Sequence, residues 1–83
     1  MHLLDIDQLR SLIAIADTGS FTRAAEKVFK TQSAVSMQMK RLEEQLGRPI
    51  FHKEGRGARL NEDGDRLLSY ARRIVGLSSE CVA

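Results

Sequence analysis

Apolar residues recur at intervals of three and four over most of this 83-residue chain, which predicts helices that each bury one face. The first run follows Asp5, which can cap a core helix with Gln8 as its capping-box partner. A second run follows Ser20, whose hydroxyl can accept a backbone N–H at the start of another helix. The apolar positions of the two runs are Ile6, Leu9, Leu12, Ile13 and Ala16, then Phe21, Ala24, Ala25 and Val28.

A third helix is predicted after the N-cap Thr31, so that residues 20–47 form two helices joined at Phe29 and Lys30. Small polar side chains open this helix and cations follow them. That order suits the major groove of DNA, because the opening residues can reach base edges while Lys and Arg bind phosphate. The segment predicts a helix-turn-helix, and an ordinary amphipathic helical hairpin is the alternative. The inward stripe of the third helix consists of Val35, Met39, Leu42 and Leu46.

The pattern changes between Gly47 and Asn61, where Pro49 prevents the third helix from continuing. Residues 50–53 and 58–60 are short strand candidates on either side of a tip at residues 54–57. A hairpin beside a helix-turn-helix is typical of a wing, which would place Arg56 in an adjacent minor groove. The alternative is a surface hairpin with an incidental arginine.

The last segment predicts a long helix capped by Asn61, with acidic residues in its first turn. Its apolar stripe is more extensive than the terminal helix of a monomer needs, so we expect it to form a dimer interface. Packing against the chain's own core is the alternative, and part of the face can do both. The predicted interface residues are Leu67, Leu68, Ala71, Ile74, Val75, Ser78, Cys81 and Val82.

The net charge of +2 is distributed unevenly along the chain. Residues 22–59 hold nine cations against four acids, which gives +5, whereas residues 1–21 and 60–83 are slightly acidic. The positive charge therefore coincides with the predicted helix-turn-helix, as a phosphate-binding surface requires. An excess of this size also arises by chance in a segment of this length.

Composition narrows the classes of protein that fit. A hydrophobic content of 42% and a charged content of 29% fit a small globular domain. The single Cys81 excludes an internal disulfide framework. The chain has neither a run of 18 apolar residues nor a basic leader with an apolar core, so we expect a cytoplasmic protein without a membrane span.

The sequence offers no constellation typical of catalysis. His2 and His52 have no Cys or carboxylate at zinc spacing, and no Gly-rich phosphate-binding loop occurs. We therefore expect no metal, no cofactor and no enzymatic activity.

Several stretches together resemble the N-terminal DNA-binding domain of a LysR-type transcriptional regulator, from about residue 5 to the end. This chain departs from the family's pattern at Ser33, where proline is common, and at Met37, where a basic or amide residue is frequent. The matching stretches are residues 9–16, 19–25 and 31–36, Leu42-Glu43 with Leu46-Gly47, and Phe51 followed by Arg56 and Leu60.

The resemblance implies a mainly α fold, with a winged helix-turn-helix over residues 1–60 and a linker helix for dimerisation over residues 61–83. The effector-binding domain of such a regulator would be absent from this chain, which we expect to be either a piece of a longer protein or a chain reduced to the DNA-binding part. The domain would bind an inverted-repeat promoter site in double-stranded DNA as a homodimer. The full-length protein could be a tetramer, and a small-molecule effector would act only through the missing domain.

The candidate DNA-binding residues lie on the two helices of the predicted helix-turn-helix, on the turn between them and on the predicted wing. The alternative function is a small helical dimerisation or protein-interaction module that does not bind DNA, and steep salt dependence of duplex binding would separate the two. The candidates are Thr22, Arg23, Lys30, Thr31, Gln32, Ser33, Ser36, Met37, Lys40, Arg41, Lys53 and Arg56.

Overall fold

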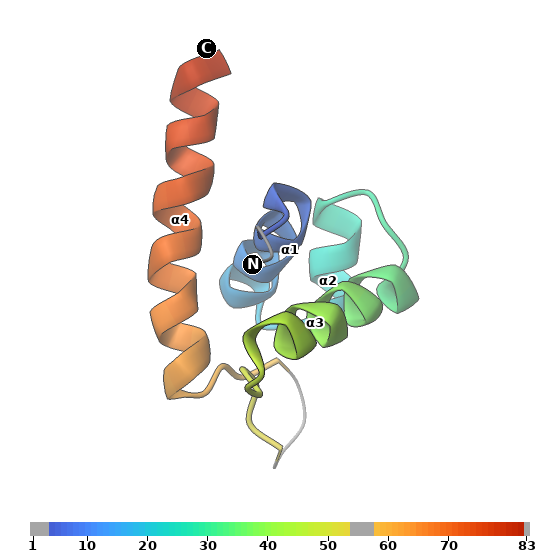
Figure 1. Ribbon diagram of the computed structural model, residues 1–83. Helices are drawn as coiled ribbons and strands as arrows, with labels where there is room; N and C mark the ends of the chain where they lie inside the picture. The colour runs from blue at the N-terminus through green and yellow to red at the C-terminus, as the bar shows by residue number, and fades with distance from the viewer. Residues whose placement is uncertain (1–3, 54–57, 83) are drawn as a thin grey trace.

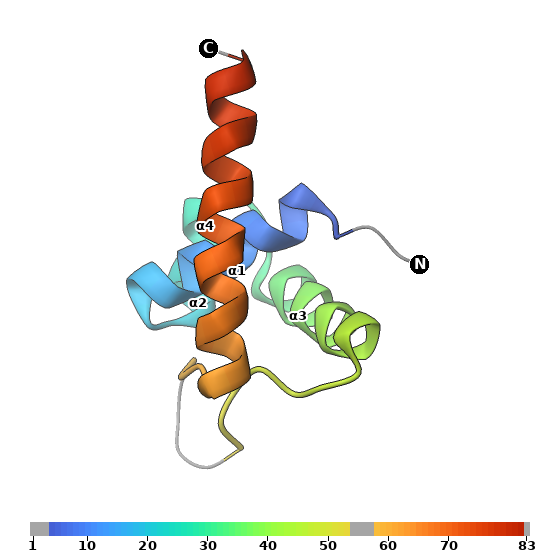
Figure 2. The same ribbon diagram turned by 60° about the vertical axis from the view of Figure 1, so that its left-hand side comes forward.

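The computed structural model describes residues 4–53 and 58–82, with side chains up to Ser78. Its helices are α1 (Ile6–Thr18), α2 (Phe21–Lys27), α3 (Gln32–Leu46) and α4 (Glu62–Val82). In Figure 1, α1, α2 and α3 form a bundle and α4 stands beside it. Figure 2 shows the last turns of α4 projecting beyond the other helices. The predicted mainly helical fold is confirmed.

Each helix begins where the sequence places a capping side chain. The backbone N–H groups of the first turn have no partner within the helix, and a side-chain oxygen of the capping residue accepts a hydrogen bond from one of them. This hydrogen bond fixes where the helix starts. The four caps are Asp5 with the N–H of Asp7 at 2.8 Å, Ser20 with Arg23 at 3.2 Å, Thr31 with Ala34 at 3.1 Å and Asn61 with Gly64 at 2.8 Å.

The capping box predicted at the start of α1 is wrong. Gln8 belongs to the buried face of α1, and its Oε1 has no hydrogen-bond partner among the described residues. The side chain therefore does not return to the backbone N–H of Asp5. Packing between helices determines where the Gln8 side chain lies, because α1 contacts all three other helices and Gln8 is on its buried face.

The core lies between α1 and the inner faces of the other helices. Leu9, Leu12 and Ile15 of α1 are fully buried, and Ala24 and Ala25 of α2 allow close helix approach. The stripe predicted for α3 is buried at its first three positions but emerges at Leu46, which is exposed. The fully buried contributors from α3 and the following segment are Val35, Leu42 and Ile50, with Met39 nearly so.

The segment between α3 and α4 is organised around the backbone of Ile50. Its N–H donates to Oε2 of Glu43 at 2.8 Å, and its carbonyl accepts the N–H of Asn61 at 3.0 Å. An antiparallel bridge pairs Phe51 with Leu60. The predicted two-stranded wing is thus represented in the described part of the chain by this bridge alone, and its tip at residues 54–57 lies outside the described residues.

The first turn of α4 lies directly against this segment. A Cβ atom added to Gly64 would lie 2.2 Å from the carbonyl oxygen of Ile50, so the two backbones are close. Further along α4, Leu67 and Ala71 are buried, and a guanidinium nitrogen of Arg72 lies 2.7 Å from Oδ1 of Asp17 in α1. None of the described helices is both long and apolar enough to cross a membrane.

Candidate nucleic-acid interface

The outer face of α3 carries a row of exposed side chains above its buried stripe. These residues line a shallow hollow of about 460 Å³ that is open to solvent. Burial of the opposite face, at Val35, Met39 and Leu42, fixes which residues face outward, because successive residues of a helix turn by about 100°. The residues that line the hollow are Gln32, Ser33, Ser36, Met37 and Lys40.

A second hollow joins the start of α2 to the start of α3. It has a volume of about 400 Å³, and Thr22 of α2 lines it together with Gln32 and Ser36 of α3. Gln32 and Ser36 line both hollows, so they occupy the ridge between them. The fold thus brings Thr22 and the opening residues of α3 onto one continuous surface.

The predicted phosphate-binding cations differ in their surroundings. Arg23, Lys40, Arg41 and Lys53 are exposed and form no ion pair with another described residue. Such side chains keep their charge available for an external anion.

Lys30 is the exception among these cations. Its Nζ lies 2.9 Å from a carboxylate oxygen of Asp7 in α1, and its side chain is only 29% exposed. The hydrogen bond from Lys30 is the main reason that the pKa of Asp7 lies below its ordinary value, and Gln38 adds a second hydrogen bond to the same carboxylate. Phosphate binding by Lys30 stays a prediction, and an acid already competes for this cation.

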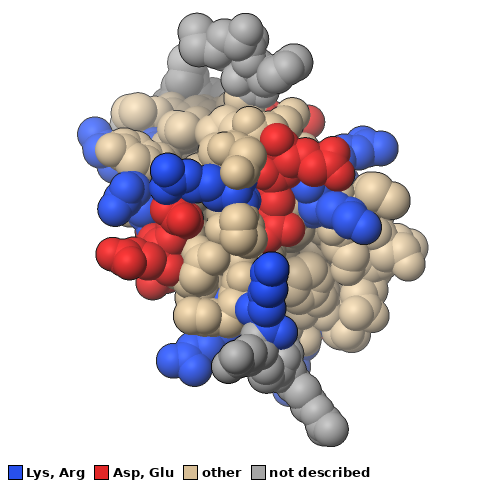
Figure 3. All heavy atoms as spheres, turned by 60° about the horizontal axis from the view of Figure 1, so that its bottom comes forward, with Lys and Arg blue, Asp and Glu red and all other residues tan. Residues whose placement is uncertain are grey.

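Charges of both signs occur on the side of the molecule that Figure 3 brings forward. Lys and Arg side chains are spread over this face, with Asp and Glu between them, and the visible atoms do not gather into a single basic patch. Arg56 belongs to the tip at residues 54–57, which lies outside the described residues. Its place in a minor groove therefore stays a prediction. The excess positive charge of residues 22–59 is therefore spread over individual side chains and does not form one basic patch on this face.

The predicted interface on α4 is divided between two surroundings. Leu67 and Ala71 are buried within the chain's own core, and Leu68 and Val75 are half-buried against it. Ile74 is exposed. Ser78 is half-buried, and the side chains of Cys81 and Val82 lie outside the described part.

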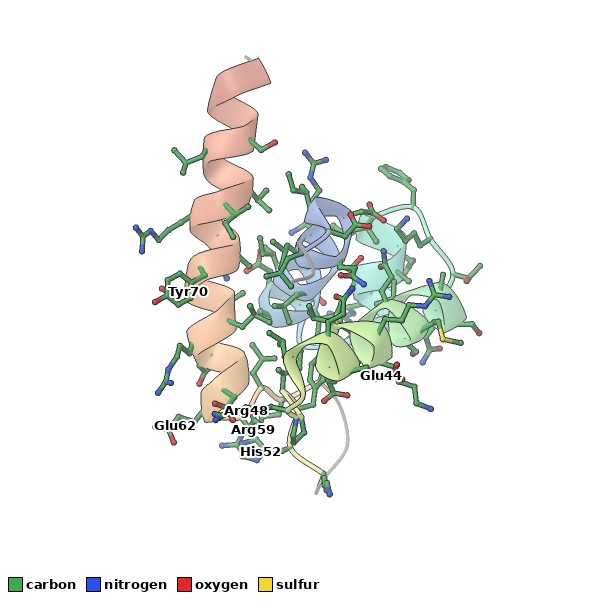
Figure 4. The ribbon with its side chains drawn as sticks, viewed as in Figure 1. Glu44, Arg48, His52, Arg59, Glu62 and Tyr70 are labelled. Carbon is green, nitrogen blue, oxygen red and sulfur yellow. The ribbon has the colours of Figure 1, made fainter. Side chains whose placement is uncertain are left out.

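The sequence reasoning missed two apolar residues on the same helix. Tyr70 is 54% exposed and Leu77 is 66% exposed, and both adjoin Ile74 at helical spacing. In Figure 4 the side chain of Tyr70 points away from α1, α2 and α3. The spacing of four and three from Tyr70 to Ile74 and Leu77 was a signal for this second stripe, but the adjacent run of more buried residues obscured it.

No group of three or more His, Cys, Asp or Glu side chains that could hold a metal ion occurs in the described part of the chain. His52 is exposed beside the Phe51–Leu60 bridge. The functional groups exposed on the outer face of α3 are the amide, hydroxyl, thioether and ammonium groups of the residues that line its hollow.

Comparison with known proteins places the chain among bacterial regulators. The model of the family described as "Bacterial regulatory helix-turn-helix protein, lysR family" matches residues 6–65. The chain is 48% identical over 80 residues to the HTH-type transcriptional regulator DgdR of Burkholderia cepacia, covering 96% of this chain and 27% of that protein. It is 46% identical over 80 residues to the regulator PecT of Dickeya dadantii, covering 96% and 25% respectively. The chain spans about a quarter of the length of these relatives.

Several similar solved structures contain DNA, and two of them show the extent of the likeness. The CbnR DNA-binding domain in its DNA complex has a TM-score of 0.87 and 32% identity, over 94% of this chain and 90% of that chain. The BenM DNA-binding domain with benA site 1 DNA has a TM-score of 0.89 and 28% identity, over 95% and 89%. The helical arrangement of Figure 1 is thus shared with domains that were crystallised on DNA.

Proposed function

Because this chain belongs to the LysR family of bacterial regulatory helix-turn-helix proteins and carries their DNA-binding domain, we propose that α3 reads a specific promoter sequence in the major groove. The observation that carries the proposal is the exposed row on α3 from Gln32 to Lys40, set above a fully buried inner face. The likeness to domains crystallised on DNA favours this function over a protein-interaction module without DNA binding.

The opening residues of α3 have the chemistry of base recognition. The amide of Gln32 can pair with adenine through two hydrogen bonds, and the hydroxyls of Ser33 and Ser36 can donate or accept. The thioether of Met37 is exposed on the same row and suits the methyl group of thymine. These four side chains would set the sequence preference.

The surrounding cations and hydroxyls would bind the DNA backbone. Lys40 and Arg41 lie behind the reading residues, where long cationic side chains suit phosphate. Thr22 lines a hollow with the start of α3, and Thr31 caps that helix. Together with the exposed Arg23 they would fix the register of α3 on the DNA backbone. Lys53 and Arg56 would serve the wing, with Arg56 in a narrow minor groove.

Two substitutions on α3 separate base reading from phosphate binding. Selection of bound sequences from a random duplex pool supplies the operator. Gln32→Ala should cost about 1–3 kcal/mol on that operator and little on random DNA. Arg41→Ala should weaken binding to both and make the negative slope of log affinity against log salt less steep by about one unit.

The matched control is Gln45→Ala, which truncates an exposed glutamine near the far end of α3 and should leave both affinities unchanged. If the unmodified chain binds duplex DNA without a steep salt dependence, the proposed function is wrong and the interaction module is favoured. If Arg56→Ala leaves the preference for A·T-rich flanks unchanged, the wing does not enter the minor groove.

We also propose that α4 joins two copies of the chain, so that a two-fold dimer meets an inverted repeat. The exposed stripe of Tyr70, Ile74 and Leu77 supports this, since it is apolar and adjoins the half-buried Val75. Leu67 and Ala71, which serve the chain's own core, would contribute only indirectly. A two-fold dimer presents its recognition helices to half-sites roughly 34–36 Å apart.

Ile74→Asp tests this dimer, because it places a charge within the exposed stripe. The variant should sediment as a monomer and lose most of its affinity for the full repeat, while binding one half-site as the unmodified chain does. Ser69→Asp introduces the same charge at another exposed position of α4 and should stay dimeric. Normal binding of the full repeat by Ile74→Asp would show that α4 does not form the interface.

A further inference from the structure

Gln38 of α3 is held at both ends of its side-chain amide by α1. Its Nε2 donates to Oδ2 of Asp7 at 2.8 Å, and its Oε1 accepts a hydrogen bond from the hydroxyl of Ser11. Ser11 is fully buried, while Gln38 is half-buried at the margin of the α3 stripe. The same Asp7 carboxylate also receives Nζ of Lys30, at 2.9 Å, from the turn that precedes α3. We call these four residues the Asp7 cluster.

The Asp7 cluster supplies a kind of constraint that the apolar core cannot. Burial of Val35, Met39 and Leu42 holds α3 against α1, but hydrophobic contact has no preferred direction. Hydrogen bonds weaken steeply when their angles depart from linearity, so two of them on one planar amide oppose rotation of the helix. No other side-chain hydrogen bond joins α1 to α3 in the part of the chain that the structure describes.

Gln38 does not belong to the exposed row of α3. The row is lined by Gln32, Ser33, Ser36, Met37 and Lys40, whereas Gln38 reaches back to α1. An effect of Gln38 on DNA recognition must therefore pass through the orientation of the helix.

We propose that Gln38 is a positioning residue, which through Ser11 and Asp7 sets the rotation of α3 and so the sequence specificity of the domain. The proposal rests on the proposed role of α3 as the recognition helix. Hydrogen bonds to base edges require distances within a few tenths of an ångström, so a small rotation of α3 disrupts them. Contacts between flexible cations and phosphate tolerate the same rotation.

The decisive variant is Gln38→Glu, which retains an acceptor for Ser11 but places a carboxylate against that of Asp7. It should bind the selected operator roughly tenfold more weakly, as expected for the loss of about one base contact. The ratio of operator affinity to random-DNA affinity should fall by the same factor. Gln45→Glu adds the same negative charge elsewhere on α3, at a residue outside the cluster and the exposed row, and should preserve that ratio.

The reciprocal pair Asp7→Asn/Gln38→Glu provides the rescue. It restores an amide-to-carboxylate hydrogen bond between α1 and α3 with donor and acceptor exchanged, and its net charge equals that of the unmodified chain. The affinity ratio should return to within about twofold of the original value, since the lost directional bond is replaced by a similar one. A role in folding alone would change the melting temperature and the fraction of active protein, but not this ratio at a temperature where every variant is folded.

Two results would overturn the positioning role. One is an equal loss of affinity for operator and random DNA in Gln38→Glu, and the other is a double variant that folds but does not recover the ratio. If Gln38→Glu fails to fold, Ser11→Ala tests the same link by removing one hydroxyl, and an unchanged affinity ratio in that variant would also refute the proposal. Equal affinity of the unmodified chain for operator and random DNA is a different failure, because it would overturn the proposed function itself.

Discussion

Gly64 and Gly76 lie on the same helix in opposite surroundings, so the same substitution to alanine should change stability in opposite directions. A Cβ atom at Gly64 would lie 2.2 Å from the carbonyl oxygen of Ile50 and 2.9 Å from Cδ2 of Leu60. A Cβ atom at Gly76 would have no neighbour within 4 Å. The first contact is with backbone, which cannot move aside as the end of a side chain can.

The magnitudes follow from two opposing terms. Alanine is more favourable than glycine inside a helix by about 0.8–1.0 kcal/mol, so Gly76→Ala should stabilise the fold by about 1 kcal/mol. In a domain of this size that gain raises the melting temperature by about 4–8 °C. Gly64→Ala receives the same gain, but overpacking against Ile50 costs about 1–3 kcal/mol or more. Because the clash is with backbone, the cost should lie in the upper part of this range, and we expect a net destabilisation of about 1–2 kcal/mol.

Thermal and urea unfolding followed by far-ultraviolet circular dichroism measure both variants. Several protein concentrations are needed, because association through α4 would make the melting temperature depend on concentration. The reasoning requires opposite signs for the two substitutions. If Gly64→Ala proved as stable as Gly76→Ala, the close approach of α4 to Ile50 would be refuted.

Three further substitutions have defined outcomes. Phe29 has a φ of 58°, in the left-handed region that asparagine tolerates better, and its side chain is 95% exposed. Phe29→Asn should therefore raise the free energy of unfolding in urea by about 0.5–1 kcal/mol. A loss of stability would mean that the ring makes a stabilising contact. The hydrogen bond from Lys30 lowers the pKa of Asp7 in the folded state below 3.8. The ionised Asp7 carboxylate therefore stabilises the fold above about pH 4, and this stabilisation is lost as pH falls through the lowered pKa. Asp7→Asn should therefore flatten the acid limb of the stability profile, and an unchanged limb would exclude this carboxylate as a cause of acid unfolding. Asp17→Asn removes the contact with Arg72 and should lower the melting temperature slightly at low salt, with a difference that shrinks as salt is added.

Helix starts were predictable from the sequence because capping is local. Asp5, Ser20, Thr31 and Asn61 each bond to an N–H two or three residues away, so residue type and position carry the whole signal. The exposed face of α3 was predictable for a similar reason, since a helical period relates its outward residues to its inward stripe.

Contacts between helices were not predictable in the same way. A helical period tells which residues share a face, but it does not tell which other element lies against that face. Ser11 and Gln38 are 27 residues apart, and nothing local to either pairs them. For the same reason the sequence did not tell which apolar residues of α4 lie against the core, where the fold buries Leu67 and leaves Tyr70 exposed.

The arrangement around Ile50 has a mechanical consequence. The N–H of Ile50 donates to the Glu43 carboxylate of α3, and the carbonyl of Ile50 accepts the N–H of Asn61, the N-cap of α4. One residue therefore connects two helices that do not touch each other directly among the described residues. With 21 residues, α4 is about 31 Å long, and a tilt of about 10° at one end displaces the other by about 5 Å. A load on the projecting end of α4 would reach α3 through Ile50 and through α1, which packs against both helices.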